Sequence, residues 1–244
     1  MIREGGKMEK IKRAIVLANK NKPIARQVKS KVEAYLCSRG VSVSAARPQL
    51  VVTVGGDGTV LFSKRYYGIP FFSIGSGTSF VCQADFSNWQ RKLSRALAKP
   101  SLDRRLLLDC RLGGRHLPPT LNEIGIRNPE PRVISIHLQC GLRHFAFRAD
   151  GVFFSTPTGS PAYAYSCGGV QMGKNSQDYQ AVAISPFRRL FKPQIIKKGT
   201  ACTLRISGHE RAQLFIDGQP IGVFTEKNTL AVRAARKPFL FLKA

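Results

Sequence analysis

The chain has 244 residues, of which 43% are hydrophobic and 22% charged, with 22 glycines and 14 prolines. This length suits one large domain or two small ones, and the composition excludes a wholly disordered chain and a collagen-like repeat. No apolar run approaches the roughly 20 residues that span a bilayer, and the charged N-terminal stretch is unlike a secretory signal. We therefore expect a soluble cytoplasmic protein that binds no membrane.

The net charge is +25, from 39 Lys and Arg against 14 Asp and Glu. A field of this sign attracts polyanions, but the bases are spread over both halves of the chain, which does not indicate a specific nucleic-acid partner. Two interpretations stay open. The charge reflects a general bias toward solubility, or it raises the local concentration of ATP or polyphosphate.

The six cysteines contain no CxxC spacing, and the four histidines are scattered. This pattern predicts no zinc site and no other metal site built from protein ligands. We expect the cysteines to be reduced thiols, mostly in the core.

The first hundred residues alternate between apolar strands and helical patterns, which is typical of a Rossmann-like α/β domain. The helix over 23–39 begins at a proline, ends before Gly40, and carries Ile24, Val28 and Val32 at helical spacing. The predicted elements are strands over 11–18, 41–43, 50–54 and 71–74 and helices over 23–39 and 89–98.

From residue 101 the pattern changes to short β-rich runs separated by turn residues, with a helix that begins near Ser160. We expect a mainly-β domain over residues 101–234, while residues 235–244 can return to the α/β domain over 1–100. The predicted strands are 104–112, 124–127, 133–140, 144–154, 181–185, 203–207, 213–216 and 229–233.

The first candidate site is the segment Gly55-Gly56-Asp57-Gly58-Thr59, directly after a buried strand. Glycines let backbone amides approach a phosphate, and a helix that starts near Thr59 favours the same anion. A carboxylate there repels phosphate unless it accepts a hydroxyl proton or engages Mg²⁺. The alternative is a β-hairpin, because Asp-Gly is also a strong turn signal.

The second candidate runs from Asp150 through the Ser/Thr/Gly loop over 155–160 to Tyr163 and Ser166. Hydroxyls and free amides suit sugar and phosphate oxygens, and a tyrosine can stack on a base. A polar loop that caps a helix through Thr158 or Ser160 is the structural alternative. A third candidate is the pair Asn122-Glu123, which can bind a ribose diol or simply end a strand.

Taken together, these segments resemble the NAD kinases in order and approximate spacing: GGDGT, then Asn-Glu, then DG-x-x-x-STPTGS-x-AY, and finally an Asp217-Gly218-Gln219 turn. The resemblance covers residues 12 to 240. GGDGT is shared with lipid kinases and phosphofructokinases, whereas STPTGS-x-AY with Asn-Glu is specific. The family's fold is an α/β domain followed by a mainly-β domain.

The resemblance implies that the chain transfers the terminal phosphate of ATP, or of polyphosphate, to the 2′-hydroxyl of the adenosine ribose of NAD, giving NADP. Asp57 then accepts the hydroxyl proton, and Gly55, Gly56, Gly58 and Thr59 face the phosphates. The residues implied to bind the dinucleotide are Asn122, Glu123, Arg132, Arg148, Asp150, Thr158, Ala162, Tyr163, Ser166 and Gln219.

The family also implies Mg²⁺ or another divalent metal that arrives with the triphosphate. It further implies a homodimer or homotetramer that packs through the β domains, often with a neighbour's residues completing the NAD pocket. No specific nucleic acid is implied as a partner.

The chain departs from the family pattern at several positions. Gly75 replaces an asparagine, Phe80 replaces a glycine, Pro161 replaces a frequent threonine and Ala149 replaces the glycine before Asp150. The segment over 185–190 also lacks a histidine that is often present. These changes leave two alternatives open: a catalytically weak member that binds nucleotides or polyanions, and a lipid or small-alcohol kinase.

Overall fold

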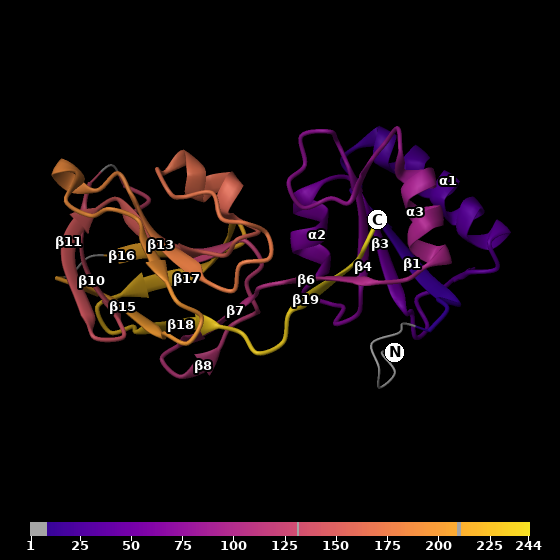
Figure 1. The fold of residues 1–244 in the computed structure, drawn as a ribbon. Helices are drawn as coiled ribbons and strands as arrows, with labels where there is room; N and C mark the ends of the chain where they lie inside the picture. The colour runs from indigo at the N-terminus through magenta and orange to yellow at the C-terminus, as the bar shows by residue number, and fades with distance from the viewer. Residues whose placement is uncertain (1–8, 131, 209–210) are drawn as a thin grey trace. The chain divides into compact units, whose positions relative to one another are not determined.

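The structure is a computed structural model that describes residues 9–130, 132–208 and 211–244. The chain forms two compact units, one ending at Arg104 and resuming at Phe239, and the other comprising Arg105–Pro238. The sequence analysis placed the corresponding boundaries near residues 100 and 234. The C-terminal segment lies in the first unit, where the chain end in Figure 1 is drawn beside β3 and β4.

The first unit is an α/β layer, as the sequence predicted. The sheet order is β2-β1-β3-β4-β19-β6, with β5 also paired to β4. Its elements are β1 (Arg13–Ala18), α1 (Pro23–Ser38), β2 (Ser42–Val43), β3 (Leu50–Val54), α2 (Asp57–Ser63), β4 (Phe71–Gly75), β5 (Ala84–Asp85), α3 (Trp89–Ala98), β6 (Leu102–Arg105) and β19 (Phe239–Leu242).

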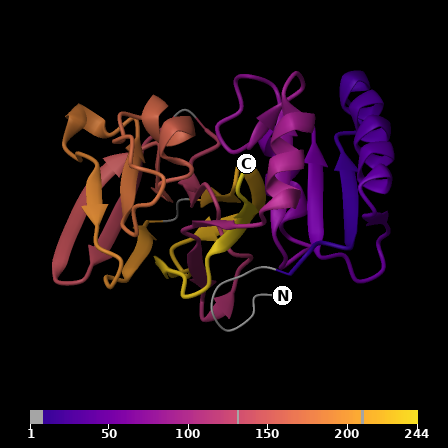
Figure 2. The same cartoon turned by 45° about the vertical axis from the view of Figure 1, so that its right-hand side comes forward.

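Strands β1, β3 and β4 pair in parallel, so their carboxyl ends meet at one edge of the sheet. Every residue of β3 is buried, which is typical of a parallel strand covered on both faces. Helix α1 buries Val28, Val32 and Leu36 against the sheet, whereas Ile24, in the first turn of the helix, is exposed. Figure 2 shows the parallel strands with the helices packed beside them.

The second unit consists of two six-stranded antiparallel sheets. One has the order β11-β10-β15-β18-β7-β8 and the other β14-β13-β12-β9-β16-β17. The strands are β7 (Leu108–Leu112), β8 (Arg115–His116), β9 (Glu123–Arg127), β10 (Ile134–Cys140), β11 (Arg143–Ala149), β12 (Gly151–Ser155), β13 (Tyr179–Ile184), β14 (Gln194–Ile196), β15 (Cys202–Ser207), β16 (Arg211–Ile216), β17 (Gln219–Thr225) and β18 (Leu230–Ala234).

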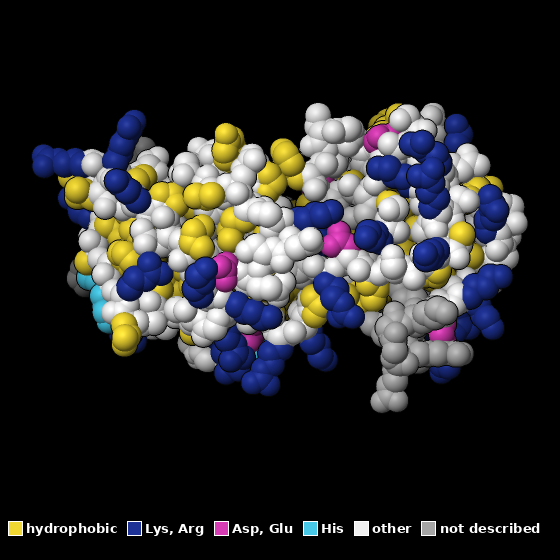
Figure 3. Space-filling view, viewed as in Figure 1, with side chains coloured by type: hydrophobic (Ala, Val, Ile, Leu, Met, Phe, Trp, Pro, Cys, Tyr) yellow, Lys and Arg dark blue, Asp and Glu magenta, His cyan; other side chains and the backbone are white. Residues whose placement is uncertain are grey.

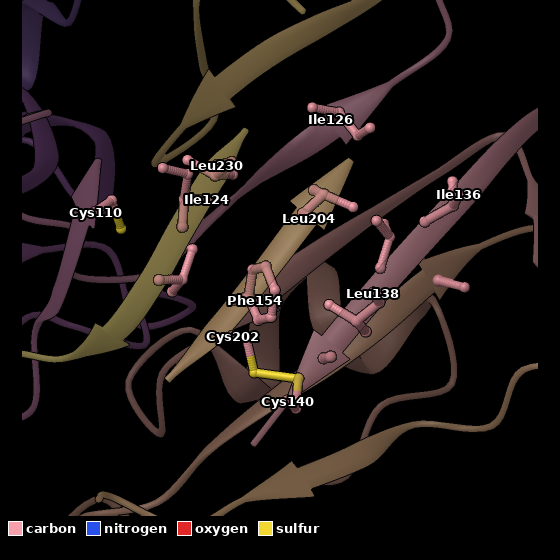
Figure 4. Packing of buried hydrophobic residues seen from close by; sticks show 14 of the residues in the cluster. Cys110, Ile124, Ile126, Ile136, Leu138, Cys140, Phe154, Cys202, Leu204 and Leu230 are labelled. Atoms are coloured by element: carbon pink, nitrogen blue, oxygen red, sulfur yellow. A yellow bond between two sulfur atoms is a disulfide. The ribbon is translucent and has the colours of Figure 1, made fainter. Parts of the chain in front are cut away.

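One hydrophobic core draws on both sheets of this unit. Figure 4 shows Leu138 and Leu204 from one sheet with Ile124 and Phe154 from the other. Along β10 the pattern alternates between buried and exposed residues, as expected for a strand with one face on the core. A short π-helical turn, η1 (Ser160–Ala164), follows β12, and a 3-10 turn, η2 (Phe187–Arg189), follows β13.

Two predicted strands are wrong in extent. The run over 104–112 is divided into β6, which belongs to the first unit, and β7. The run over 144–154 is divided at Asp150 into β11 and β12, which lie in different sheets. Continuous β-forming sequence does not reveal where a chain leaves one sheet for the other.

The expectation that all cysteines are reduced is also wrong. Cys140 and Cys202 form a disulfide between directly paired residues of β10 and β15 (Figure 4). The remaining cysteines, Cys37, Cys82, Cys110 and Cys167, are not part of a disulfide. Among the described residues, no helix is long and apolar enough to cross a bilayer.

Candidate functional site

The turn after β3 lies at the carboxyl edge of the first unit's sheet. Gly55 and Gly56 have φ of 147° and 120°, conformations that favour glycine, and Asp57 begins helix α2. A side chain at Gly55 would collide with Asn19, which follows β1, and with the Thr59 hydroxyl. The segment is therefore a strand–turn–helix, and the alternative of a β-hairpin is wrong.

The Asp57 carboxylate is held by the loop that follows β4. Its Oδ2 accepts a hydrogen bond from the Phe80 amide at 2.9 Å, and its Oδ1 accepts one from the Val81 amide at 3.0 Å. The Cys82 thiol lies 3.7 Å from Oδ1. Burial, followed by the nearby Asp57 charge, raises the pKa of Cys82 to about 12, so this thiol is a protonated donor.

Two further features of this turn were missed by the sequence analysis. The Lys22 ammonium donates a hydrogen bond to the Gly55 carbonyl at 3.1 Å, which places a cation at the glycine turn. Its position immediately before Pro23, between β1 and α1, was the available signal. Gly75 is also spatially constrained, because a side chain there would collide with the Ser79 hydroxyl and approach the Cys82 sulfur to 2.7 Å.

In the second unit, the three remaining motifs converge through hydrogen bonds. The buried Asp217 carboxylate accepts from the amides of Leu121, at 3.1 Å, and Asn122, at 2.7 Å. The Asp217 amide in turn donates to the Glu123 carbonyl at 2.8 Å. Asp217 therefore ties the 217–219 turn to the Asn-Glu pair, a positioning role that its distance along the chain concealed.

The Ser/Thr/Gly loop joins the same cluster. The Thr156 amide donates to the Asn122 carbonyl at 2.9 Å, and the Thr156 hydroxyl accepts from the Thr158 and Gly159 amides. A side chain at Gly159 would overlap the Asn122 backbone, which explains the glycine. Neither Thr158 nor Ser160 caps the following turn through its side chain. The structural alternative, a loop that merely caps a helix through Thr158 or Ser160, is therefore wrong.

Two polar atoms in this cluster are buried without a hydrogen-bond partner: Asn122 Oδ1 and Thr158 Oγ1. A buried polar atom without a partner costs about 1–3 kcal/mol. The cluster thus offers two groups that gain from binding a ligand with hydroxyl or amide donors. Thr59 Oγ1 in the first unit is buried and unpartnered in the same way.

Glu123 lines a pocket of about 210 Å³ together with Arg127, Tyr163, Phe215 and Gly218. Burial, and then the charge of Asp217, raises the pKa of Glu123 to about 7. The Tyr163 ring stacks on Phe153 at 5.0 Å, which fixes its orientation at the pocket. A carboxyl group and an aromatic ring at one pocket suit a ribose and its base.

The other predicted residues near this pocket are less enclosed. Ala162 is half-buried in the π-helical turn, with a non-helical ψ of −123°. Ser166 is exposed one turn after Tyr163, and Gln219 is exposed at the start of β17. Ala162 and Ser166 thus share a short segment with Tyr163, and Gln219 follows the pocket residue Gly218.

Asp150, Arg148 and Arg132 form a separate group at the opposite end of β12. Gly151 pairs with Arg127, whereas Ser155 pairs with Glu123, so Asp150 lies about 16 Å along the strand from the Asn-Glu pair. The Asp150 carbonyl accepts from the Asn128 amide, and the Asn128 side chain donates to the Arg132 carbonyl. Arg148 is exposed on β11, over the Phe187 ring.

An α/β unit with a glycine turn and a lone carboxylate, joined to a β unit with a small open pocket at the buried Glu123, is the arrangement expected of a protein that handles a nucleotide. The family model of the ATP-NAD kinase C-terminal domain matches residues 121–244. The NAD kinase of Methanosarcina barkeri is 31% identical over 201 residues, covering 80% of this chain and 73% of that protein. The NAD kinase of Nitratidesulfovibrio vulgaris is 31% identical over 239 residues, covering 87% and 80%. The chain belongs to the NAD kinase family.

Solved structures agree on the fold. A yeast NADH kinase in complex with NADH superimposes with a TM-score of 0.86 at 19% identity, covering 97% of this chain and 84% of that one. An NAD kinase from Archaeoglobus fulgidus in complex with ATP gives a TM-score of 0.81 at 23% identity, covering 95% and 93%. The two-domain fold expected from the sequence is confirmed.

Proposed function

We infer that this chain is an NAD kinase, which transfers the terminal phosphate of ATP to the 2′-hydroxyl of the adenosine ribose of NAD. The observation that carries this inference is the hydrogen-bonded convergence of Asn122, Glu123 and the Ser/Thr/Gly loop on Asp217. These are the segments that distinguish NAD kinases from other GGDGT kinases. The related kinases that act on lipids or small alcohols are not favoured.

Asp57 is the proposed proton acceptor. As the ribose oxygen bonds to the terminal phosphorus, the bond from that phosphorus to the bridging oxygen breaks, ADP leaves, and the hydroxyl proton passes to the carboxylate. Oδ1 accepts the Val81 amide and faces the Cys82 thiol, whereas Oδ2 accepts the Phe80 amide and keeps a further lone pair for the substrate. The amides therefore orient the Asp57 carboxylate and still leave it able to accept the proton of the ribose hydroxyl.

Around this base, the turn formed by Gly55, Gly56, Gly58 and Thr59 is proposed to face the phosphates. Gly56 and Gly58 would do so through backbone amides and Thr59 through its hydroxyl, because the amides of Gly55 and Thr59 donate to the carbonyls of Ile74 and Gly56. Lys22 joins this set, because its ammonium at the Gly55 carbonyl supplies positive charge at the turn. Within the described residues, no group of three or more His, Cys, Asp or Glu could hold a metal. We therefore propose that Mg²⁺ enters bound to the triphosphate, whose oxygens are its preferred ligands.

For the dinucleotide, we propose that Asn122 and Glu123 bind the ribose, with Thr158 beside them. Tyr163, with Ala162 and Ser166 on the same segment, is proposed to line the adenine side, and Gln219 to close the pocket from β17. The unpartnered Asn122 Oδ1 and Thr158 Oγ1 support this assignment.

The test is formation of NADP from NAD and Mg²⁺ with ATP or polyphosphate as donor. Asp57→Asn should lower kcat about 100- to 10,000-fold while NAD binding is retained. Glu33→Gln is the matched control, because it removes a half-buried carboxylate on α1 of the same unit, paired with Lys29 at 3.5 Å, and should leave kcat unchanged. NAD binding without product, in wild type and Asp57→Asn alike, would instead identify a binding member of the family. The donor preference and the cytoplasmic location stay predictions.

Asp150, Arg148 and Arg132 lie away from the Glu123 pocket, and we propose that they complete the pocket of a neighbouring subunit in a homodimer or homotetramer. Mixing experiments test this proposal. If Asp150→Ala and Asp57→Asn are each inactive, co-refolded mixtures should regain activity, because a mixed pair holds one site with both native residues. No recovery in mixtures shown by sedimentation to be oligomeric would overturn the proposal.

A further inference from the structure

The Cys82 thiol contacts the proposed base, Asp57, without taking part in the phosphate transfer itself. Its sulfur lies 3.7 Å from Asp57 Oδ1, on the same carboxylate that accepts the Phe80 and Val81 amides. The side chain is half-buried in the loop that follows β4. A thiol is a weak hydrogen-bond donor, so its position against a reactive carboxylate calls for a physical explanation.

Ser79 contacts the thiol from the same loop. Burial raises the pKa of Cys82 most, followed by the charge of Asp57, whereas a hydrogen bond with the Ser79 hydroxyl lowers this pKa. These directions mean that the Ser79 hydroxyl donates to the sulfur and that the thiol donates to the carboxylate. Ser79 Oγ also lies 3.4 Å from Ser76 Oγ, which lies 2.9 Å from Thr78 Oγ1. Neighbouring hydroxyls therefore hold Ser79 in place.

The space for Ser79 and Cys82 depends on the glycine at position 75. A side chain at Gly75 would collide with the Ser79 hydroxyl, and its Cβ would lie 2.7 Å from the Cys82 sulfur. The backbone is held there, because Gly75 ends the buried strand β4 and pairs with Asp85 of β5. The asparagine that the family resemblance implies at this position would need the space that the two side chains fill. The departure at Gly75 is therefore coupled to Ser79 and Cys82.

The thiol makes the two oxygens of Asp57 different. Oδ1 accepts the Val81 amide and faces the Cys82 thiol, whereas Oδ2 accepts the Phe80 amide. Each carboxylate oxygen has two lone pairs, so two donors occupy Oδ1 and one lone pair stays available on Oδ2. Without the thiol, the two oxygens would each hold one amide and would be equivalent toward a substrate hydroxyl.

We propose that Cys82, held by Ser79, is a positioning residue that occupies Asp57 Oδ1 and leaves Oδ2 to accept the proton of the ribose hydroxyl. The O–H bond of that hydroxyl breaks as its oxygen bonds to the terminal phosphorus, and the proton passes to Oδ2 while the thiol keeps its own proton. Gly75 is the substitution that gives this pair room. The proposal rests on the proposed function, because it assigns a role within the same site.

The first test compares two substitutions of Cys82. Cys82→Ala removes the donor and should lower kcat about tenfold, with KM for ATP and for NAD unchanged, because the contact orients the base and not the substrates. Cys82→Ser keeps a hydroxyl donor and should recover most of kcat. Cys37→Ala, which changes an exposed cysteine on α1 of the same unit, is the matched control. Wild-type kcat in Cys82→Ala, or equal losses in the Ala and Ser variants, would overturn the proposal.

The second test uses the space that the three positions share. Gly75→Asn alone is expected to lose about 100-fold in activity, because the new side chain displaces the loop. When Gly75→Asn is combined with Ser79→Ala and Cys82→Ala, the asparagine has room. The triple variant should then match Cys82→Ala, about tenfold below wild type. A loss of roughly 1,000-fold, the product of the separate losses, would show that the positions are independent and would overturn the proposal.

The third test detects the contact without a need for activity. It measures alkylation of Cys82 by iodoacetamide at alkaline pH, by mass spectrometry of the peptide that contains it. Asp57→Asn removes a charge that raises the pKa of this thiol, so alkylation should be severalfold faster than in wild type, whereas Cys37 should react at the same rate in both. Figure 3 shows many Lys and Arg side chains and few acidic ones on the visible face, so a neutral reagent is used because this field concentrates anionic ones.

The outcomes separate the two proposals. If Cys82 is alkylated at the same rate in Asp57→Asn and in wild type, the thiol does not act on the carboxylate and the positioning role is wrong. If wild type forms no NADP, the proposed function fails, and faster alkylation in Asp57→Asn would still show that the thiol contacts Asp57.

Discussion

The two carboxylates proposed to serve the reaction lie in opposite environments. Asp57 is half-buried and receives two backbone amides and a thiol from three consecutive residues, all of them donors. Glu123 is buried, and the charge that raises its pKa further is a second carboxylate, Asp217. The donors fix the orientation of the Asp57 carboxylate, whereas burial beside a like charge makes the protonation of Glu123 sensitive to pH near neutrality. A proton acceptor and a ribose ligand need these different properties.

Among the variants that test these two environments, Gly75→Asn is expected to have the largest effect, because it alters the loop around Asp57. Asparagine is the residue that the resemblance to the family implies at this position. Its side chain would collide with Ser79 and Cys82, and its Cβ would lie 3.1 Å from the Gly56 backbone. The loop that holds Asp57 must then move. We expect a loss of about 1–3 kcal/mol in the free energy of unfolding. Activity should fall about 100-fold.

The matched control is Gly77→Ala, two residues further along the same loop. A methyl group there meets no atom within 4 Å, so stability and kcat should both stay near wild type. Denaturant unfolding and steady-state kinetics give the two readouts. Full activity in Gly75→Asn would show that the loop does not need its present packing to hold Asp57.

The pH dependence of stability sharpens the comparison at Glu123. The pKa of Glu123 is raised from 4.5 to about 7 in the folded state, so ionisation of this group destabilises the fold. Its contribution to the free energy of unfolding is therefore fully present below pH 4.5 and is lost as the pH rises through 7. The loss amounts to roughly 3 kcal/mol at most. Glu123→Gln, which stays neutral, should remove this dependence and unfold at higher denaturant concentration than wild type at pH 8.

Glu33→Gln again serves as the control, because the half-buried Glu33 carboxylate makes only a helix-surface ion pair with Lys29, and its removal should change the pH profile of unfolding little. The same pH profile of unfolding in Glu123→Gln as in wild type would mean that Glu123 ionises in the folded state without a loss of stability.

NAD binding should change with pH in the opposite direction to stability. NAD affinity in wild type should rise from pH 6 to pH 8, as the ionised carboxylate becomes available to the ribose hydroxyls.

The sequence alone predicted the local structure around Asp57 and Glu123 better than it predicted which groups surround their carboxylates. The apolar run over 50–54 and the glycines after it predicted the strand–turn–helix at Asp57, because both signals are local. The amides of Phe80 and Val81 reach Asp57 through the backbone, and backbone donors carry no residue signature. Asp217 lies more than ninety residues from the amides it binds, and Cys140 meets Cys202 only because β10 pairs with β15.

Charge was the least readable feature. The even spread of bases along the chain indicated a diffuse field, and only the strand register shows which basic residues are neighbours, as with His137 on β10 and Arg205 on β15. Lys22 was passed over as one of many lysines, although it stands directly before the first residue of α1. In both cases the positions became informative only after strand register and chain direction were known.

Tyr163→Ala examines the base side of the Glu123 pocket. Loss of a stacking ring costs about 1–3 kcal/mol, so KM for NAD should rise about tenfold while kcat changes little. Tyr163→Phe should retain most of the affinity. Tyr165→Ala, which removes an exposed ring on the same turn, is the control and should leave KM unchanged. Equal KM values for the alanine variants at 163 and 165 would remove Tyr163 from the pocket.

The smallest effect is expected at Lys22, because its ammonium is only partly buried and water screens its charge. Lys22→Ala should raise KM for ATP about threefold and leave KM for NAD unchanged. Lys20→Ala, an exposed lysine in the same loop, changes the net charge equally and should have no effect. If KM for ATP rises more at low salt than at high salt, and does so in Lys22→Ala but not in Lys20→Ala, the effect comes from a local contact between Lys22 and the phosphates. Equal rises in both variants would assign it to the overall field of this basic chain.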